Sequence, residues 1–147
     1  MICTFFGHRD SPSQLIPLIK ETIIDLVENK GVNEFYVGNQ GRFDKMVYRV
    51  LRDVKRLYPD ISYKVALAYM PKTKDNDDVI DYKDTVFLDS LEEVPARFAI
   101  DKRNRLLVDM ADIVVVYVTY PGNADKFMRL AKRKGKQIIN LADKEQK

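Results

Sequence analysis

Strand-like apolar runs alternate with helical stretches along the whole chain, and this alternation limits the fold more than any other feature. Between most of these runs, apolar residues recur at the three- and four-residue spacing of an amphipathic helix. Strands joined through helices form a mainly parallel sheet with helices on both faces. We therefore predict one α/β domain over residues 1–147, a Rossmann-like doubly wound sheet in an order such as 3-2-1-4-5. The predicted strands are 2–6, 34–37, 63–70, 85–88 at an edge, 113–118 and 137–141.

Capping residues indicate where the first helix begins and ends. Ser11 with Gln14 three residues later matches an N-terminal capping pattern. Pro17 would then lie inside the helix, so Ser13 is an alternative cap. Gly31 follows the last helical residues and suits a left-handed C-cap.

The C-terminal half shows similar signals. Pro95 is predicted to open a helix that runs to about Ala111, and Asn123 to cap the last long helix. That helix ends in the basic run 132–134, which complements the negative end of its dipole better than it indicates nucleic-acid binding. The tail after Ala142 is expected to fray.

Composition excludes several classes of protein. Hydrophobic residues make up 46% of the chain, yet no apolar run approaches the roughly 20 residues of a membrane span. The first residues, 1–6, lack the basic region and cleavage site of a signal peptide. Cys3 is the single cysteine, and a reduced, buried thiol is expected. A net charge of +3 without a clustered patch does not favour nucleic acid. We predict a cytoplasmic protein without a membrane partner.

Residues 71–84 form a polar segment rich in aspartate. Their spacing lacks the glycine and terminal glutamate of an EF-hand calcium loop, and we predict no metal site. We expect a mobile surface loop that could close over a ligand.

A turn bounded by two glycines follows the second strand. Phe35–Val37 leads into Gly38-Asn39-Gln40-Gly41, and a helical pattern starts directly afterwards. The first N–H groups of a helix lack partners and carry partial positive charge, and glycine lets an anion approach the backbone. The turn thus suits a phosphate, with Asn39 or Asp44 contacting sugar hydroxyls. The other interpretation is a structural turn that needs positive φ.

The first strand ends in Gly7-His8-Arg9-Asp10. This loop, the Gly38–Gly41 turn and residues 119–123 are expected to meet, because the carboxyl ends of parallel strands share one edge of the sheet. Arg9 would bind phosphate through its planar guanidinium, or form a salt bridge with Asp10 or Asp44. We expect His8 to order the loop and not to form a catalytic pair with Asp10, because no nucleophile is suitably spaced.

Three segments together resemble the SLOG superfamily: Phe5–Arg9, Val37–Asp44, and Arg103–Arg105 ahead of Met110–Asp112 and a hydrophobic strand. This superfamily includes DprA-type DNA-processing proteins, LOG-type phosphoribohydrolases and the YpsA-like proteins of Gram-positive bacteria and their phages. The similarity spans nearly the whole chain and is greatest to the small stand-alone YpsA-like branch. The resemblance implies a nucleotide-binding domain, in a group whose members commonly form homodimers.

LOG-type hydrolases cleave the N-glycosidic bond of nucleoside monophosphates with an arginine and with a glutamate in a PGGxGTxxE motif. The resemblance places Arg103 at the arginine position. The second motif departs from the pattern: Pro121-Gly122-Asn123 lacks the paired glycines, Lys126 stands where the glutamate is expected, and Asp125 is one position early. This departure favours binding over catalysis. The alternative for Arg103 is an exposed helical residue paired with Asp101.

We therefore predict a domain that binds or senses a nucleotide or nucleotide derivative and requires no cofactor. One alternative is a phosphoribohydrolase in which Arg103 acts with Asp125 or Asp44. Another is DprA-like binding of single-stranded DNA, which the scattered basic residues disfavour. The predicted ligand-binding residues are Gly7, His8, Arg9, Gly38, Asn39, Gln40, Gly41, Asp44, Pro121, Gly122 and Asn123.

Overall fold

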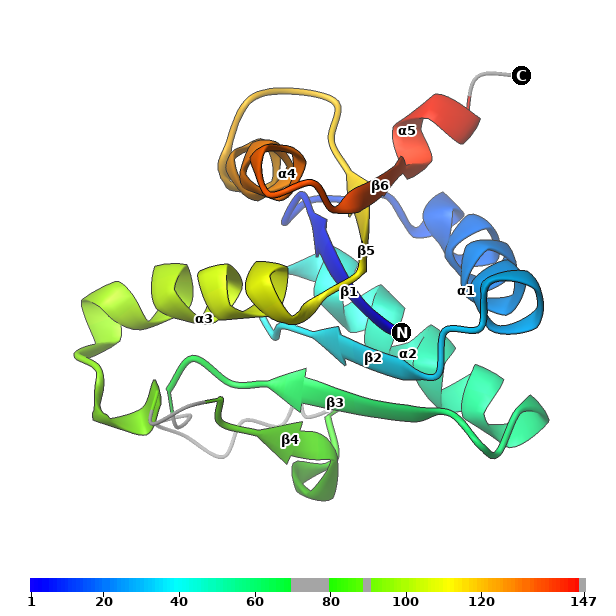
Figure 1. The fold of residues 1–147 in the computed structure, drawn as a ribbon, viewed down its shortest axis with the longest axis horizontal. Helices are drawn as coiled ribbons and strands as arrows, with labels where there is room; N and C mark the ends of the chain where they lie inside the picture. Colours follow the sequence, from blue (N-terminus) through cyan, green and yellow to red (C-terminus); the bar gives the residue numbers. More distant parts are fainter. Residues whose placement is uncertain (70–79, 89–90, 146–147) are drawn as a thin grey trace.

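The computed structural model describes residues 1–69, 80–88 and 91–145, and these form an α/β fold around one parallel sheet (Figure 1). The strand order is β4-β3-β2-β1-β5-β6. This is the predicted doubly wound order with one short edge strand beyond β3, so the fold class is confirmed. The strands are β1 (Ile2–Gly7), β2 (Glu34–Val37), β3 (Ser62–Ala66), β4 (Thr85–Val86), β5 (Ile113–Tyr117) and β6 (Gln137–Asn140).

Helices cover both faces of the sheet because its central strands carry apolar residues on both sides. Cys3 and Phe5 pack with the side that bears α1 (Ile16–Lys30), α2 (Arg42–Leu57) and the short α5 (Leu141–Lys144). Phe6 packs on the opposite side with α3 (Ala96–Met110) and α4 (Asn123–Arg133). Every residue of β5 is buried, as expected for a strand covered on both faces.

The direction of winding reverses between β1 and β5. From β1 the chain proceeds through β2 and β3 on one side, and it later returns to place β5 on the other side of β1. Gly7 at the carboxyl end of β1 pairs with Tyr117 at the carboxyl end of β5, so the loops after these strands begin side by side and diverge. Open α/β sheets bind ligands at such a point.

The start of the first helix differs from the prediction. Ser11 does not cap it: the buried Ser11 Oγ donates to His8 O at 2.7 Å, and this bond closes the loop after β1. A 3-10 turn, η1 (Ser13–Leu15), comes first, and α1 begins at Ile16. Pro17 then lies in the first turn of the helix, where its missing N–H costs no helical hydrogen bond. Gly31 has φ of 73°, which confirms the left-handed C-cap.

Two further corrections concern the second half. Asn123 is the first residue of α4, after the N-cap residue Gly122, and its side chain makes no capping hydrogen bond. The tail does not fray directly after Ala142. The Asn140 side chain accepts from the Ala142 N–H at 3.1 Å, and Leu141 is buried against the core, so α5 extends to Lys144.

The polar segment 71–84 is described only at its end, since residues 70–79 lie outside the described part. The third strand ends at Ala66, earlier than the predicted Met70. Residues 82–84 form a second 3-10 turn, η2 (Tyr82–Asp84), and a third, η3 (Leu91–Glu93), precedes α3. Tyr48 of α2 donates to Asp84 at 2.7 Å and accepts from the Asp81 N–H at 2.8 Å, which positions η2 beside α2.

Within the described ranges, no helix is both long and apolar enough to cross a membrane.

Candidate functional site

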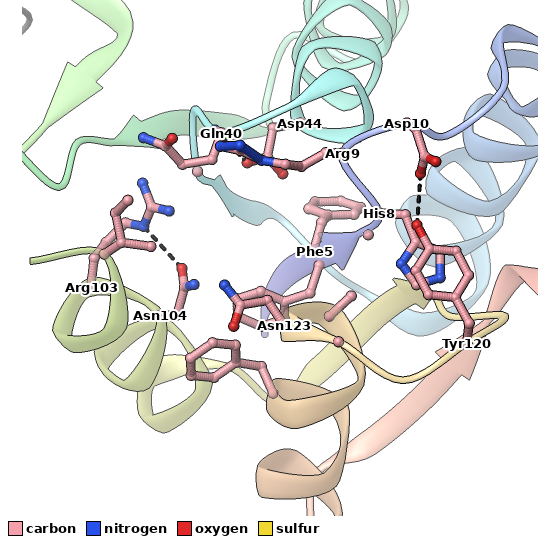
Figure 2. A pocket seen from close by; sticks show the side chains of 17 residues that line it. Phe5, His8, Arg9, Asp10, Gln40, Asp44, Arg103, Asn104, Tyr120 and Asn123 are labelled. Atoms are coloured by element: carbon pink, nitrogen blue, oxygen red, sulfur yellow. Dashed lines mark hydrogen bonds between the residues drawn. The ribbon is translucent and has the colours of Figure 1, made fainter.

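A pocket of about 700 Å³ opens at the carboxyl ends of β1, β2 and β5, where the winding reverses (Figure 2). The three loops that the fold was expected to bring together all contribute to it, and α3 adds a fourth wall. The lining residues are Phe5, Phe6, Gly7, His8, Arg9, Asp10, Gly38, Gln40, Asp44, Ile100, Arg103, Asn104, Tyr120, Gly122, Asn123, Ala124 and Phe127.

Three glycines beside the pocket are required by close packing. A Cβ on Gly7 would lie 2.2 Å from Phe43 Cγ, and one on Gly38 would lie 2.9 Å from Arg103 Cζ. Gly41 has φ of 92°, and a Cβ there would lie 2.8 Å from the Arg9 Cα. Steric demands therefore account for all three glycines without a ligand. The positive φ that the structural-turn interpretation expected is present at Gly41 but not at Gly38.

Two backbone N–H groups, one in the Gly38–Gly41 turn and one at the start of α2, are bonded within the protein. Gln40 N–H donates to Asp44 Oδ2 at 2.8 Å, and Arg42 N–H donates to Arg9 O at 3.0 Å. Asp44 lies in the first turn of α2, where a carboxylate that bonds back to a preceding N–H also complements the helix dipole. The chain's own carboxylate thus lies where an anion at this turn was expected.

Arg103 lies under the pocket and is only 2% exposed. Its Nη1 donates to Asn39 Oδ1 at 2.9 Å and to Ala66 O at 3.1 Å, and its Nε donates to Asn104 Oδ1 at 3.0 Å. The alternative of an exposed arginine paired with Asp101 is therefore wrong. A sequence signal exists for this burial, because Arg103 is four residues after the buried Ala99 on the inward face of α3.

Asp101 has other partners on the protein surface. It accepts from Arg105 and from Lys126, each at 2.7 Å. Both bonds keep the pKa of Asp101 below its usual value.

Asp44 and Arg103 lie on either side of Gly38. A Cβ on Gly38 would be 3.0 Å from Asp44 Oδ2 and 2.9 Å from Arg103 Nη2. Burial raises the pKa of Asp44 to about 6, although the Arg103 charge and the Gln40 N–H both favour the ionised form. Burial lowers the pKa of Arg103, against the effect of Asp44. The pocket thus combines a buried cation with a carboxylate that titrates close to neutral pH.

His8 joins the loops after β1 and β5. Its Nε2 accepts from the Thr119 N–H at 2.9 Å, and its ring stacks on Tyr120 with a centroid distance of 3.7 Å. Tyr120 donates to Asp10 at 2.8 Å, so a second bond joins the same two loops. Burial lowers the pKa of His8, which favours the neutral ring that this hydrogen bond needs. The geometry agrees with the expected loop-ordering role.

Arg9 is exposed and lines the pocket. Asp10 and Asp44 both lie in the described part of the chain, and neither forms an ion pair with Arg9. Asn39 and Gly41, both predicted to bind the ligand, are not among the lining residues. Asn39 bonds to Arg103, and Gly41 packs on the Arg9 backbone.

Asp125, the predicted alternative acid, is not among the lining residues and pairs with Arg129 at 3.0 Å. Pro121 is also outside the lining, whereas Gly122 and Asn123 contribute to it. Among the described residues, no group of three or more His, Cys, Asp or Glu side chains is arranged to hold a metal ion.

Eight lining residues were absent from the predicted site: Phe5, Phe6, Asp10, Ile100, Asn104, Tyr120, Ala124 and Phe127. Most are apolar, and Phe6 of β1 stacks on Phe127 of α4, on the face of the sheet that α4 covers, with a centroid distance of 5.4 Å. In the sequence such residues cannot be told from core residues. For Asn104, the sequence offered one indication that it belongs to the site, namely its position next to the predicted Arg103.

No protein-family model and no curated protein sequence matches this chain. Its function therefore has to be inferred from the pocket residues themselves.

Proposed function

We propose that this chain is a binding domain for a nucleotide or nucleotide derivative, which occupies the pocket at the carboxyl ends of β1, β2 and β5. The observation that carries the proposal is the composition of this pocket: an apolar wall faces an exposed arginine, a buried arginine and a buried carboxylate at the point where the sheet reverses.

The dimensions and chemistry support a ligand of this class. A volume of about 700 Å³ falls within the range of small-molecule sites. Phe5, Phe6 and Phe127 line the pocket and are at most 6% exposed, so they give a base or sugar ring a limited apolar contact. The exposed guanidinium of Arg9 suits a phosphate, and the buried charge of Arg103 adds positive potential where little water screens it.

The resemblance to the SLOG superfamily supports the same proposal. The segments that carry it, Phe5–Arg9, Val37–Asp44 and Arg103–Arg105, are the ones that supply most of the polar lining. We propose membership of this superfamily on these grounds.

Thermal unfolding in the presence of nucleoside mono- and diphosphates, cyclic nucleotides and ADP-ribose tests the proposal. A ligand present at about 100 times its Kd stabilises the folded state by about 2.7 kcal/mol, which raises Tm by several degrees. Arg9→Ala should weaken binding about tenfold through loss of a charge-assisted bond. Arg49→Ala is the matched control, because Arg49 is an exposed residue of α2 outside the pocket.

Two results would count against the proposal. The absence of any stabilisation by the whole set contradicts nucleotide binding. Equal stabilisation of wild type and Arg9→Ala contradicts the assignment of the phosphate to Arg9.

A second candidate is hydrolysis of the N-glycosidic bond, and the position of Asp44 favours it. A carboxyl group with a pKa of about 6 beside a buried arginine can exchange protons near neutral pH. Asp44 lines the pocket, whereas Asp125 does not. If the chain is a hydrolase, Asp44 is therefore the acid that we assign to the reaction.

Chromatography of nucleoside monophosphates incubated with the protein tests this candidate. We expect wild type and Asp125→Asn to release free base at similar rates, and Asp44→Asn to release it at least about 100-fold more slowly. Circular dichroism shows whether each variant is folded. Lack of base release at high protein concentration eliminates hydrolysis, and loss of release in Asp125→Asn alone transfers the role to Asp125.

A further inference from the structure

We propose that Asp44 makes the pocket selective for ligands with the vicinal hydroxyl groups of ribose, by accepting a hydrogen bond from one of them. This inference rests on the proposed function and specifies which part of the ligand lies beside α2.

Asp44 is a buried acceptor with unused capacity. Its side chain lines the pocket although the residue is only 8% exposed. Oδ2 accepts from the Gln40 N–H, and no other hydrogen bond to this carboxylate is found in the described part of the chain. A carboxylate offers about four lone-pair sites, and buried polar groups are almost always satisfied. Among the described residues, Thr22 Oγ1 is the one fully buried side-chain nitrogen or oxygen without a partner, so the free oxygen of Asp44 is reachable from the pocket and can accept from a ligand there.

Arg103 does not take up this capacity. Its recorded hydrogen bonds go to Asn39, Ala66 and Asn104, and it forms no ion pair with Asp44. The guanidinium thus favours the charge of Asp44 from across Gly38 while the acceptor stays available. A phosphate placed against Asp44 would be repelled, whereas a hydroxyl group would be attracted. The sugar is therefore the part of a nucleotide that fits here, with the phosphate nearer to Arg9.

Asn104 supplies the complementary donor. Arg103 Nε can only donate, so the oxygen of the Asn104 amide must face it, at 3.0 Å. The amide nitrogen then points into the pocket, as Figure 2 shows, with no partner found among the described residues. The residue is 7% exposed. Each hydroxyl of a vicinal diol can donate and accept, which matches an acceptor on α2 and a donor on α3 that both line the pocket.

The other acceptors near the pocket fit a hydroxyl less well. Asn39 Oδ1 already accepts from Arg103 at 2.9 Å and from Gln40 Nε2 at 3.2 Å. Asp10 is exposed to water and accepts from Tyr120. Asp44 is thus the buried carboxylate of the lining, where a hydrogen bond is least weakened by competing water.

Isothermal titration with paired ligands tests the inference: adenosine, guanosine, cytidine and uridine 5′-monophosphates against their 2′-deoxy and 3′-deoxy counterparts. We expect at least one deoxy form to bind about 10- to 100-fold more weakly than the ribonucleotide, the loss typical of a hydrogen bond to a charged group. In Asp44→Asn this ratio should fall to below about threefold, since the charge is lost while an amide oxygen can still accept from Gln40 N–H. Asp53→Asn, an exposed residue on the same helix, should keep the wild-type ratio.

The outcomes separate this inference from the proposed function. Equal affinity of wild type for ribo- and both deoxynucleotides overturns diol recognition and leaves nucleotide binding in place. An unchanged ratio in folded Asp44→Asn overturns the role of Asp44. If no nucleotide binds at millimolar concentration, the proposed function and this inference both fail. If Asp44→Asn does not fold, the ratio in wild type and its change in Asn104→Ala decide the question.

Discussion

At the scale of single residues, the pocket depends on three glycines, whose lack of a side chain lets other residues approach closely. Gly7, Gly38 and Gly41 each leave room for a neighbour: the Phe43 ring, the Asp44 and Arg103 side chains, and the Arg9 backbone respectively. From the sequence, the glycines of the Gly38–Gly41 turn were interpreted either as making room for a phosphate or as forming a structural turn. Their observed neighbours are protein atoms, so their first role is to let β1, β2 and α3 approach α2 closely.

Gly7→Ala should destabilise the fold by about 2 kcal/mol or more, because the added Cβ would lie 2.2 Å from the buried Phe43 ring. Gly122→Ala is the matched control. Its φ of 164° is extended backbone open to any residue, and no atom lies within 4 Å of an added Cβ. Urea unfolding curves measure both variants. Similar midpoints for the two would show that the core around Phe43 relaxes without cost.

At the scale of elements, two loops form one unit. The loop after β1 and the loop after β5 are joined by the Thr119–His8 hydrogen bond, by the stacked rings of His8 and Tyr120, and by the Tyr120–Asp10 hydrogen bond. These contacts hold the two loops that flank the reversal of the sheet. The pocket wall is therefore largely formed before a ligand arrives, which lowers the entropic cost of binding.

Acid should weaken this unit through His8. The folded state lowers the pKa of His8 below the usual 6.5, so the unfolded chain binds the proton more readily. The stability that His8 contributes is therefore fully present above about pH 6.5 and is lost as the pH falls through the folded-state pKa. His8→Phe keeps an aromatic ring beside Tyr120 but cannot titrate or accept from Thr119.

Urea unfolding of wild type and His8→Phe at about pH 7.5 and about pH 5 measures this effect. The stability advantage of wild type should shrink at the lower pH. His8 is the single histidine of the chain, and Asp44 titrates in both proteins, so the difference isolates His8. An advantage that is independent of pH would exclude the proposed coupling of its charge to stability.

At the scale of the whole molecule, the sheet brings together segments that are far apart in the sequence. The pocket draws on residues from Phe5 to Phe127, and its polar groups come from α2, α3, the start of α4 and the loops after β1, β2 and β5. Helices on both faces bury most of β1 and all of β5, the two strands between which the winding reverses, so the site lies on a rigid edge. This arrangement suits recognition of a ligand with several different chemical groups.

The sequence by itself determined the class of fold, most element boundaries and the loops that meet at the site. Periodicity and turn chemistry are local properties, and the handedness of parallel connections leaves few arrangements of the strands. The N-caps predicted at Ser11 and Asn123 were wrong, because Ser11 bonds to His8 instead and because the helical turn at α4 already begins at Asn123, after Gly122.

Only the tertiary structure decided how the site residues are used. Whether Arg103 was exposed or buried, and whether Asp44 or a ligand occupied the turn at Gly38–Gly41, depended on distances between α2, α3 and the strands. The hydrogen bonds of Arg103 to Asn39 and Ala66 join segments far apart in the sequence, and no local pattern encodes them. For the same reason, the apolar wall of the pocket could not be separated from the core until the fold was known.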